Sequence, residues 1–290
     1  MRTGRDVRIT AEMNWGAPQM RGLSISAAWD ESKAILAHDG RLLMTVALAL
    51  VAFPSAINNL INPAGVAGTS PLWVDAVTFV VTLLTLTGQL ALIRLALGPS
   101  ITVGSAISHG FQRLPAYCLV VVILLVGLFL LAVPCAVVLA ALGVPLETRP
   151  LQLTPAAALV LLIYLAVAVY FAVRLVLSSA VASAEDLGPI AILKRSWRLT
   201  AGNWWTLFGF LMIFVVAAIV LLVAIGSAAG VIVNLLVGSL QPMSAAALIV
   251  ALIQAVVSAA ITALFSVMLA RIYLQLAGRN AQASVPSSGI

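Results

Sequence analysis

Long apolar stretches alternate with short polar gaps along most of the chain. An α-helix needs about 20 apolar residues to cross the roughly 30 Å hydrocarbon core of a bilayer. Six stretches meet this requirement, and the third contains no charged residue. They cover residues 42–61, 72–97, 116–142, 156–179, 204–225 and 245–270. The pattern predicts an all-α, polytopic membrane protein with six transmembrane helices.

Some of these stretches contain residues that can bend or end a helix. Pro54 and Pro134 lie near the C-terminal ends of the first and third stretches, and each should kink its helix or end it early. After the fifth stretch, two glycines and Asn234 are followed by more apolar residues. Segment 226–240 is therefore expected either to extend the fifth helix or to form a short interfacial or re-entrant piece.

Hydroxyl and proline residues mark the expected helix starts. Ser70-Pro71 and Thr154-Pro155 each place a capping hydroxyl before a proline at the first helical position. Ser244 can cap the sixth helix in the same way. These signals support the division into six spans.

The composition agrees with a chain that is solvated by lipid. Hydrophobic residues make up 63% of the sequence and charged residues 8%, and the mean hydropathy is +1.16. A soluble domain usually carries about 25% charged residues. So few polar side chains cannot cover a water-facing surface, which excludes an ordinary soluble fold.

Lys and Arg gather in alternate gaps between the apolar stretches. The opposite gaps contain only Arg149, which Glu147 offsets. Because loops rich in Lys and Arg stay in the cytoplasm, we expect both termini on the cytoplasmic side of a bacterial inner membrane. The basic residues assigned to that side are Arg2, Arg5, Arg8, Arg21, Lys33, Arg41, Arg94, Arg113, Lys194, Arg195, Arg198, Arg271 and Arg279.

Each cytoplasmic gap also contains a short amphipathic segment that leads into a stretch. The segments recur at intervals of about 80 residues, which suggests three units of an interfacial helix followed by a helical hairpin. In the third segment Lys194, Arg195 and Arg198 are expected to contact anionic lipid head groups, unless the segment is an ordinary basic loop. The three segments are residues 26–36, 105–114 and 190–199.

The two ends of the chain differ from its centre. Residues 1–22 are basic and polar without an apolar core, so they are expected to form a disordered cytoplasmic tail rather than a signal peptide. Residues 278–290 are rich in Ser, Ala and Gly and are expected to form a second disordered tail. The six-span membrane domain is assigned to residues 23–277.

Polar residues inside or beside the spans are candidates for function. Arg94 and Arg174 either snorkel to the interface or form a salt bridge with the carboxylates at the inner side, Glu185 and Asp186. Gln89 and Gln254 are expected to form hydrogen bonds to neighbouring helices. These candidates are Gln89, Arg94, Arg174, Glu185, Asp186 and Gln254.

We expect no catalytic, metal or cofactor site. His38 and His109 lack partners at metal-ligand spacing, apart from Asp39 beside His38. Cys118 and Cys135 lie about 25 Å apart on one predicted helix, too far for a disulfide. The sequence also lacks a phosphate-binding loop and a nucleophile elbow.

One segment resembles a known family. Residues 184–205 contain Glu185, Gly188-Pro189, Ala191, Arg195-Ser196-Trp197, Leu199 and Gly202. In order and spacing they are similar to the membrane domain that precedes some bacterial glycerophosphoryl diester phosphodiesterases. Ala28-Trp29, Lys33 and the run from Arg271 to Leu276 also fit, so the resemblance covers roughly residues 23–277.

This resemblance implies a stand-alone bacterial membrane protein without the catalytic domain. The enzymatic members owe their activity to a separate soluble barrel with acidic metal ligands and paired histidines. A barrel of about 250 residues does not fit in the sequence after Leu276. The resemblance therefore implies no phosphodiesterase activity in this chain.

Three functions are consistent with the sequence. The first is a non-enzymatic, lipid-interacting or membrane-organising protein whose partners are anionic head groups at the cytoplasmic face, and not nucleic acid. The second is a carrier of a small or lipid-like substrate, with Gln89, Arg94, Arg174, Glu185 and Gln254 along its path. The third is a membrane partner of a separate phosphodiesterase.

Overall fold

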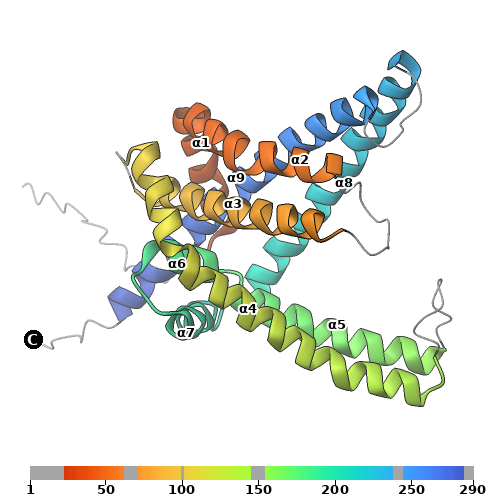
Figure 1. Cartoon of the computed structure of the whole chain (residues 1–290). Coiled ribbons are helices and arrows are strands. Elements are labelled where there is room, and N and C mark those ends of the chain that lie inside the picture. The colour runs from red at the N-terminus through yellow and green to blue at the C-terminus, as the bar shows by residue number, and fades with distance from the viewer. Residues whose placement is uncertain (1–22, 62–70, 99–100, 145–153, 238–243, 284–290) are drawn as a thin grey trace, which may run out of the picture.

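The computed structural model of the chain describes residues 23–61, 71–98, 101–144, 154–237 and 244–283 (Figure 1). All regular secondary structure in these ranges is helical. The predicted tail 1–22 lies outside them. The elements are α1 (Ile25–Ala47), the π-helical segment η1 (Leu48–Ala52), α2 (Phe53–Ile61), α3 (Leu72–Leu97), α4 (Val103–Ala141), α5 (Pro155–Leu175), α6 (Ser178–Ala184), α7 (Pro189–Leu199), α8 (Trp204–Val237) and α9 (Ala245–Ala283).

Six helical runs within these ranges are long and apolar enough to cross a membrane, which confirms the predicted fold class. Helix α8 is continuous to Val237, so residues 226–237 extend the fifth span. Residues 238–240 lie outside the described ranges. Helix α9 continues to Ala283, so the first part of the predicted tail 278–290 is helical, and residues 284–290 are not described.

The predicted helix caps are present where the structure describes them. The hydroxyl oxygens of Thr154 and Ser244 each accept a hydrogen bond from the backbone N–H three residues later, at 3.3 and 3.1 Å. Thr102 caps α4 in the same way, at 3.3 Å. Helix α3 begins after Pro71 rather than at it, and Ser70 is not among the described residues.

The prolines are accommodated without ending their helices. Pro54 is the second residue of α2, which directly follows η1. The wider turn of η1 contains Leu50, whose carbonyl group the proline ring would crowd in a regular α-helix. Pro115 and Pro134 both lie inside α4, which excludes the early end considered for Pro134. Figure 1 shows the N-terminal part of α4 running in a different direction from the rest of the helix.

Only the third predicted interfacial segment is a separate helix. Helix α7 is followed by Gly202, whose φ of +81° lies in the left-handed region that glycine adopts without strain. Segments 26–36 and 105–114 are helical but continuous with the spans that follow them. Helix α1 continues through Gly40 and α4 continues through Pro115.

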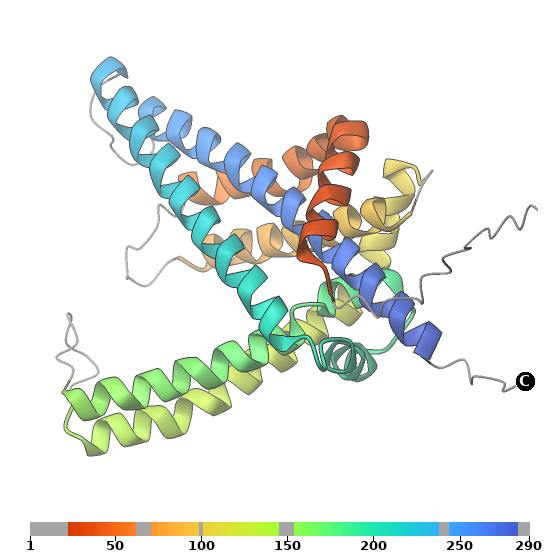
Figure 2. The ribbon, with the colours of Figure 1, turned by 180° about the vertical axis from the view of Figure 1, so that it is seen from behind.

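The long helices form three hairpins that diverge from a shared region. Helices α2 and α3, α4 and α5, and α8 and α9 pack as neighbouring pairs. Figures 1 and 2 show the three pairs spreading apart toward the same side of the molecule, with α1, α6 and α7 near the end where they converge. This arrangement agrees with the predicted division into three hairpin units.

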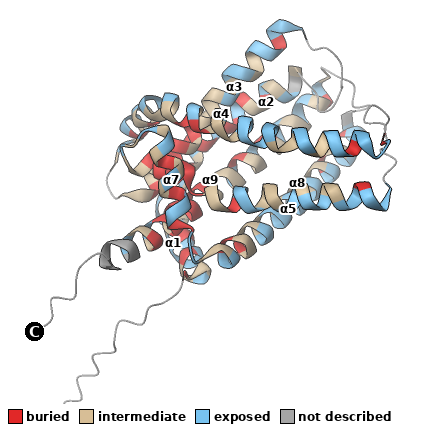
Figure 3. Ribbon diagram, turned by 90° about the horizontal axis from the view of Figure 1, so that it is seen from below, coloured by how far each residue is buried: buried red, intermediate tan, exposed pale blue. Residues whose placement is uncertain are grey.

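The buried core lies where the hairpins converge. Four consecutive residues of α3, from Leu90 to Ile93, are fully buried, so other helices surround α3 there on all sides. Figure 3 shows buried residues concentrated in this region and exposed residues along the outer hairpins. Large apolar side chains such as Phe129, Leu162 and Ile213 are exposed on α4, α5 and α8. In a membrane these surfaces face acyl chains.

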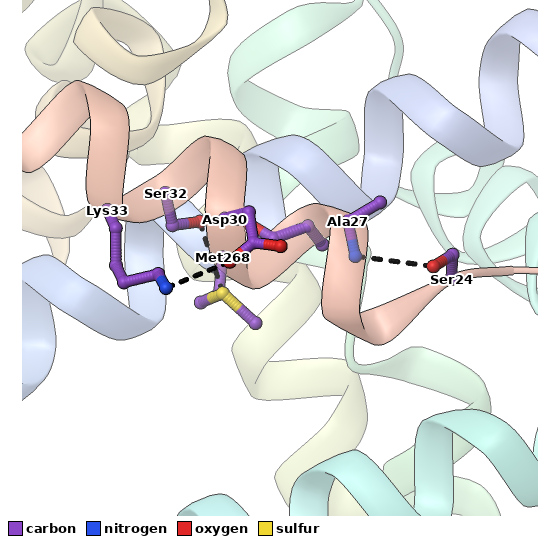
Figure 4. Close-up of polar contacts among 7 residues, drawn as sticks. Ser24, Ala27, Asp30, Ser32, Lys33 and Met268 are labelled. Atoms are coloured by element: carbon purple, nitrogen blue, oxygen red, sulfur yellow. Dashed lines mark hydrogen bonds and ion pairs between the residues drawn. The ribbon is translucent and has the colours of Figure 1, made fainter.

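Helix α1 is fixed to α9 by a buried polar contact (Figure 4). The Ser32 hydroxyl donates to the carbonyl oxygen of Ala28 at 2.7 Å and lies 3.1 Å from the Met268 sulfur of α9. Lys33 lies beside it and pairs with Asp30 at 2.8 Å on the exposed face. The face of α1 that contains Ser32 is therefore buried against the bundle, while the face that contains Asp30 and Lys33 remains exposed.

Candidate functional site

Two hydroxyl groups anchor α7 to the end of α5. Ser196 Oγ and Thr200 Oγ1 each donate to the carbonyl oxygen of Arg174 at 3.1 Å. Arg174 lies in the last turn of α5, where carbonyl groups lack a partner within the helix. These bonds turn Ile192, Ser196 and Leu199 toward the bundle, where all three are buried.

The opposite side of α7 presents two cations. Lys194 and Arg198 are exposed and lie four residues apart, so they are neighbours on the helix surface. Within the described residues, no carboxylate forms an ion pair with either one. Trp197 lies between them in the sequence and is also exposed. Both cations therefore remain candidates for contact with an anionic head group, as the sequence predicts.

A large apolar groove leads to these cations. Its volume is about 1290 Å³. Its walls come from α4 between residues 123 and 131 and from α5 between residues 168 and 175. Leu193, Lys194, Trp197 and Arg198 of α7 complete it. Gly127 widens the groove, because a Cβ there would have no heavy atom within 4 Å. The only charged side chains along its lining are the two cations of α7.

Arg195 makes contacts within the protein that the sequence analysis did not predict. Its Nε donates to Glu185 Oε1 at 2.9 Å, and the hydroxyl of Tyr273 donates to the same oxygen at 2.7 Å. About a quarter of each side chain in the ion pair is exposed, at 27% for Arg195 and 25% for Glu185. Arg195 thus joins α7 to the α6–α7 connection and to α9, rather than extending freely toward head groups.

Of the two alternatives for Arg94 and Arg174, the salt bridge to Glu185 or Asp186 is absent among the described residues. Glu185 pairs with Arg195, as described above, and Asp186 pairs with Arg113 of α4. Neither carboxylate pairs with Arg94 or Arg174 among the described residues. The reason is that the chain after α6 directs consecutive side chains to different helices, which sequence spacing does not reveal.

Arg174 lies among aromatic rings instead of beside a carboxylate. Its guanidinium carbon lies 5.4 Å from the ring centre of Tyr170 and 5.1 Å from that of Trp197. Its Nε and Nη2 also donate to the Tyr170 hydroxyl at 3.3 Å. A cation over an aromatic face is stabilised by the negative charge of the ring surface. This cluster holds Trp197 in position at the edge of the groove.

The remaining polar candidates lie apart from the groove. Arg94 lines a separate polar cavity between the end of α3 and the start of α4. Gln254 packs on α8, where a Cβ on Gly226 would overlap its side-chain amide. Gln89 is half-buried on α3. Of the five residues considered for a carrier path, none lines the groove and only Arg94 lines the polar cavity.

Sequence reasoning missed the groove walls, one ion-pair partner and one hydrogen-bond partner of the two carboxylates. The walls are ordinary apolar helix positions, and their only signal is the very high hydropathy of the third and fourth stretches. Arg113 and Tyr273 were visible as polar residues next to spans, but their partners come from another part of the chain. Among the described residues there is no group of three or more His, Cys, Asp or Glu that could hold a metal ion.

Comparison with known proteins places the chain in a family. No curated protein and no solved structure matches it. A family model described as a domain of unknown function, DUF7847, matches residues 24–276. These residues include all six spans, the groove and α7. The chain therefore belongs to the DUF7847 family of domains of unknown function.

Proposed function

We propose that this protein is a non-enzymatic integral membrane protein that binds an anionic phospholipid in the groove between α4, α5 and α7. One observation carries the proposal: an apolar groove of about 1290 Å³ ends at Lys194 and Arg198. Its walls suit acyl chains, and its two cations suit a phosphate group. Such a lining binds a lipid and supplies no group for its chemical conversion.

The head group determines which lipid the groove selects. Acyl chains gain little by entering the groove, because the surrounding bilayer is equally apolar. Each Lys or Arg near the surface of an anionic membrane contributes about 1 kcal/mol of attraction. Lys194 and Arg198 together therefore favour an anionic lipid over a zwitterionic one by about 2 kcal/mol.

The proposal includes an orientation. We place α7 and both termini on the cytoplasmic side of a bacterial inner membrane, where the anionic head groups are accessible to Lys194 and Arg198. The distribution of Lys and Arg in the sequence supports this orientation. Reporter fusions test it: a fusion at Lys194 should report the cytoplasm and one at Ser244 the opposite side, and the reverse result would exclude it.

Lipid retention tests the function. The protein is extracted with its native lipids, and the bound phosphatidylglycerol and phosphatidylethanolamine are quantified by mass spectrometry. Changing Lys194→Ala and Arg198→Ala together should lower the phosphatidylglycerol preference by about tenfold or more, because both attractive charges are lost. The exposed Arg41→Ala on α1 is the matched control and should leave the preference unchanged. An unchanged preference in the double variant would exclude the proposed site.

The partnership with a separate phosphodiesterase stays a prediction from the sequence resemblance. Co-purification from native membranes tests it. Recovery of a soluble phosphodiesterase with the wild-type protein would support the partnership, and its consistent absence would count against it.

A further inference from the structure

A second cavity, lined by five polar side chains and by Ile101, lies where α3 ends and α4 begins. Its volume is about 330 Å³. Ser105, Ser108, His109 and Gln112 line it from α4, and their spacing of three and four residues places them on one face of that helix. Arg94 lines it from the last turn of α3.

Arg94 gives this cavity its charge. Among the described residues, no carboxylate pairs with Arg94 and no hydrogen bond involves its side chain. Arg113 lies nearby but is paired with Asp186. No Asp or Glu lines the cavity. A single cation in a polar cavity without a carboxylate attracts an anion.

The surrounding groups can donate hydrogen bonds to such an anion. Ser108 and Gln112 line the same cavity as Arg94, and their hydroxyl and side-chain amide are hydrogen-bond donors. His109 Nε2 lies 3.0 Å from the carbonyl oxygen of Ser183, which can only accept, so this nitrogen carries the donated hydrogen. That bond fixes the ring and holds the cavity wall against α6.

We propose that this cavity binds the phosphate group of a phosphate-bearing anion. Arg94 matches phosphate because its guanidinium forms two parallel hydrogen bonds to two phosphate oxygens. The hydroxyl of Ser108 and the amide of Gln112 supply further donors. The site is separate from the groove: the groove begins eleven residues after Gln112, which corresponds to about 16 Å along α4.

Two sources of phosphate are distinguished by two measurements on the full chain in phosphatidylcholine nanodiscs. The first measurement titrates inorganic phosphate by isothermal calorimetry. The second adds phosphatidic acid to the nanodiscs and quantifies the lipid retained by the protein. Whichever of the two measurements detects binding to the wild-type protein, Arg94→Gln should weaken that binding by about tenfold or more. The reason is that a charge-assisted pair of hydrogen bonds is lost. Arg41→Gln on the exposed face of α1 is the matched control, because Arg41 lines neither the groove nor this cavity, and it should change neither measurement.

Each outcome decides the proposal. Phosphate binding that depends on Arg94 identifies a soluble ligand, whereas phosphatidic acid retention that depends on Arg94 but not on Arg41 identifies a lipid head group. If neither ligand depends on Arg94, or if Arg41→Gln has the same effect as Arg94→Gln, the proposal is wrong. Ser108→Ala, which removes one donor and keeps Arg94, should weaken binding less. It serves as the second variant if Arg94→Gln unfolds at a lower temperature than the wild type.

Discussion

Lys194, Arg195 and Arg198 lie within five residues of α7 but differ in their contacts, because different residues surround each of them. Arg195 faces Glu185 and is held by it, whereas Lys194 and Arg198 line the groove. The sequence shows all three as equal members of a basic interfacial segment. Their division depends on where Glu185 and Tyr273 lie in space, and both come from outside α7. Helical periodicity alone therefore could not separate the structural cation from the two exposed ones.

At the residue scale, we expect Arg195 to contribute to stability and Lys194 and Arg198 to contribute to lipid preference. Arg195→Ala should lower the free energy of unfolding by about 1 kcal/mol, because Glu185 loses a charged partner in a partly exposed setting. The phosphatidylglycerol preference should stay at the wild-type value. Denaturant unfolding in detergent, followed by circular dichroism, measures the first effect, and lipid retention measures the second.

Lys33→Ala is the matched control for this variant. Lys33 also forms an ion pair, but its side chain and that of Asp30 are 57% and 70% exposed. An exposed pair contributes little to stability, so unfolding should hardly change. The assignment of Arg195 would be wrong if its removal reduced the lipid preference as strongly as the loss of Lys194 and Arg198.

At the scale of elements, two glycines allow close packing on both sides of α3. A Cβ on Gly88 would lie 2.8 Å from Leu50 Cβ of η1. A Cβ on Gly110 of α4 would lie 2.9 Å from the carbonyl oxygen of Thr87. Small residues let helix backbones approach closely in membranes, where packing rather than hydrophobic burial drives association. Helix α3 can therefore be fully buried between η1 and α4.

Gly88→Ala should destabilise the protein by about 1–3 kcal/mol, because the added methyl group forces η1 away from α3. Gly40→Ala on α1 is the matched control: a Cβ there has no heavy atom within 4 Å. Alanine favours helix over glycine by up to about 1 kcal/mol, so this variant should be as stable as the wild type or more stable. Thermal unfolding in the same detergent compares the two, and equal melting temperatures would contradict the packing described.

The elements were predictable from sequence to different degrees. Each long apolar stretch became a span, because a helix is the structure that satisfies its own backbone hydrogen bonds in lipid. Continuity through Gly40 and Pro115 was not predictable, since packing against neighbouring helices outweighs the local cost of these residues. Of the three cytoplasmic segments 26–36, 105–114 and 190–199, only the third ends as a separate helix, and Gly202 with its positive φ follows it.

At the scale of the whole molecule, three diverging hairpins leave large apolar side chains exposed on α4, α5 and α8, as expected for helices that are solvated by lipid. The groove lies on one of these hairpins and ends at the cations of α7. Under the proposed function it joins the acyl-chain region to the head-group region. The division into three hairpins was predictable from the repeated gaps in the sequence. The groove was not, because it depends on how α7 docks at the end of α5.

Photo-crosslinking tests this account most directly. The protein is placed in nanodiscs that contain phosphatidylglycerol or phosphatidylcholine with a diazirine on the acyl chain, and the labelled peptides are mapped by mass spectrometry. Phosphatidylglycerol should label residues 123–131 and 168–175 more strongly than phosphatidylcholine does, and changing Lys194 and Arg198 to Ala should remove the difference. Labelling of the groove that equals labelling around Ile213 on the exposed surface of α8, with no preference between the two lipids, would contradict the account.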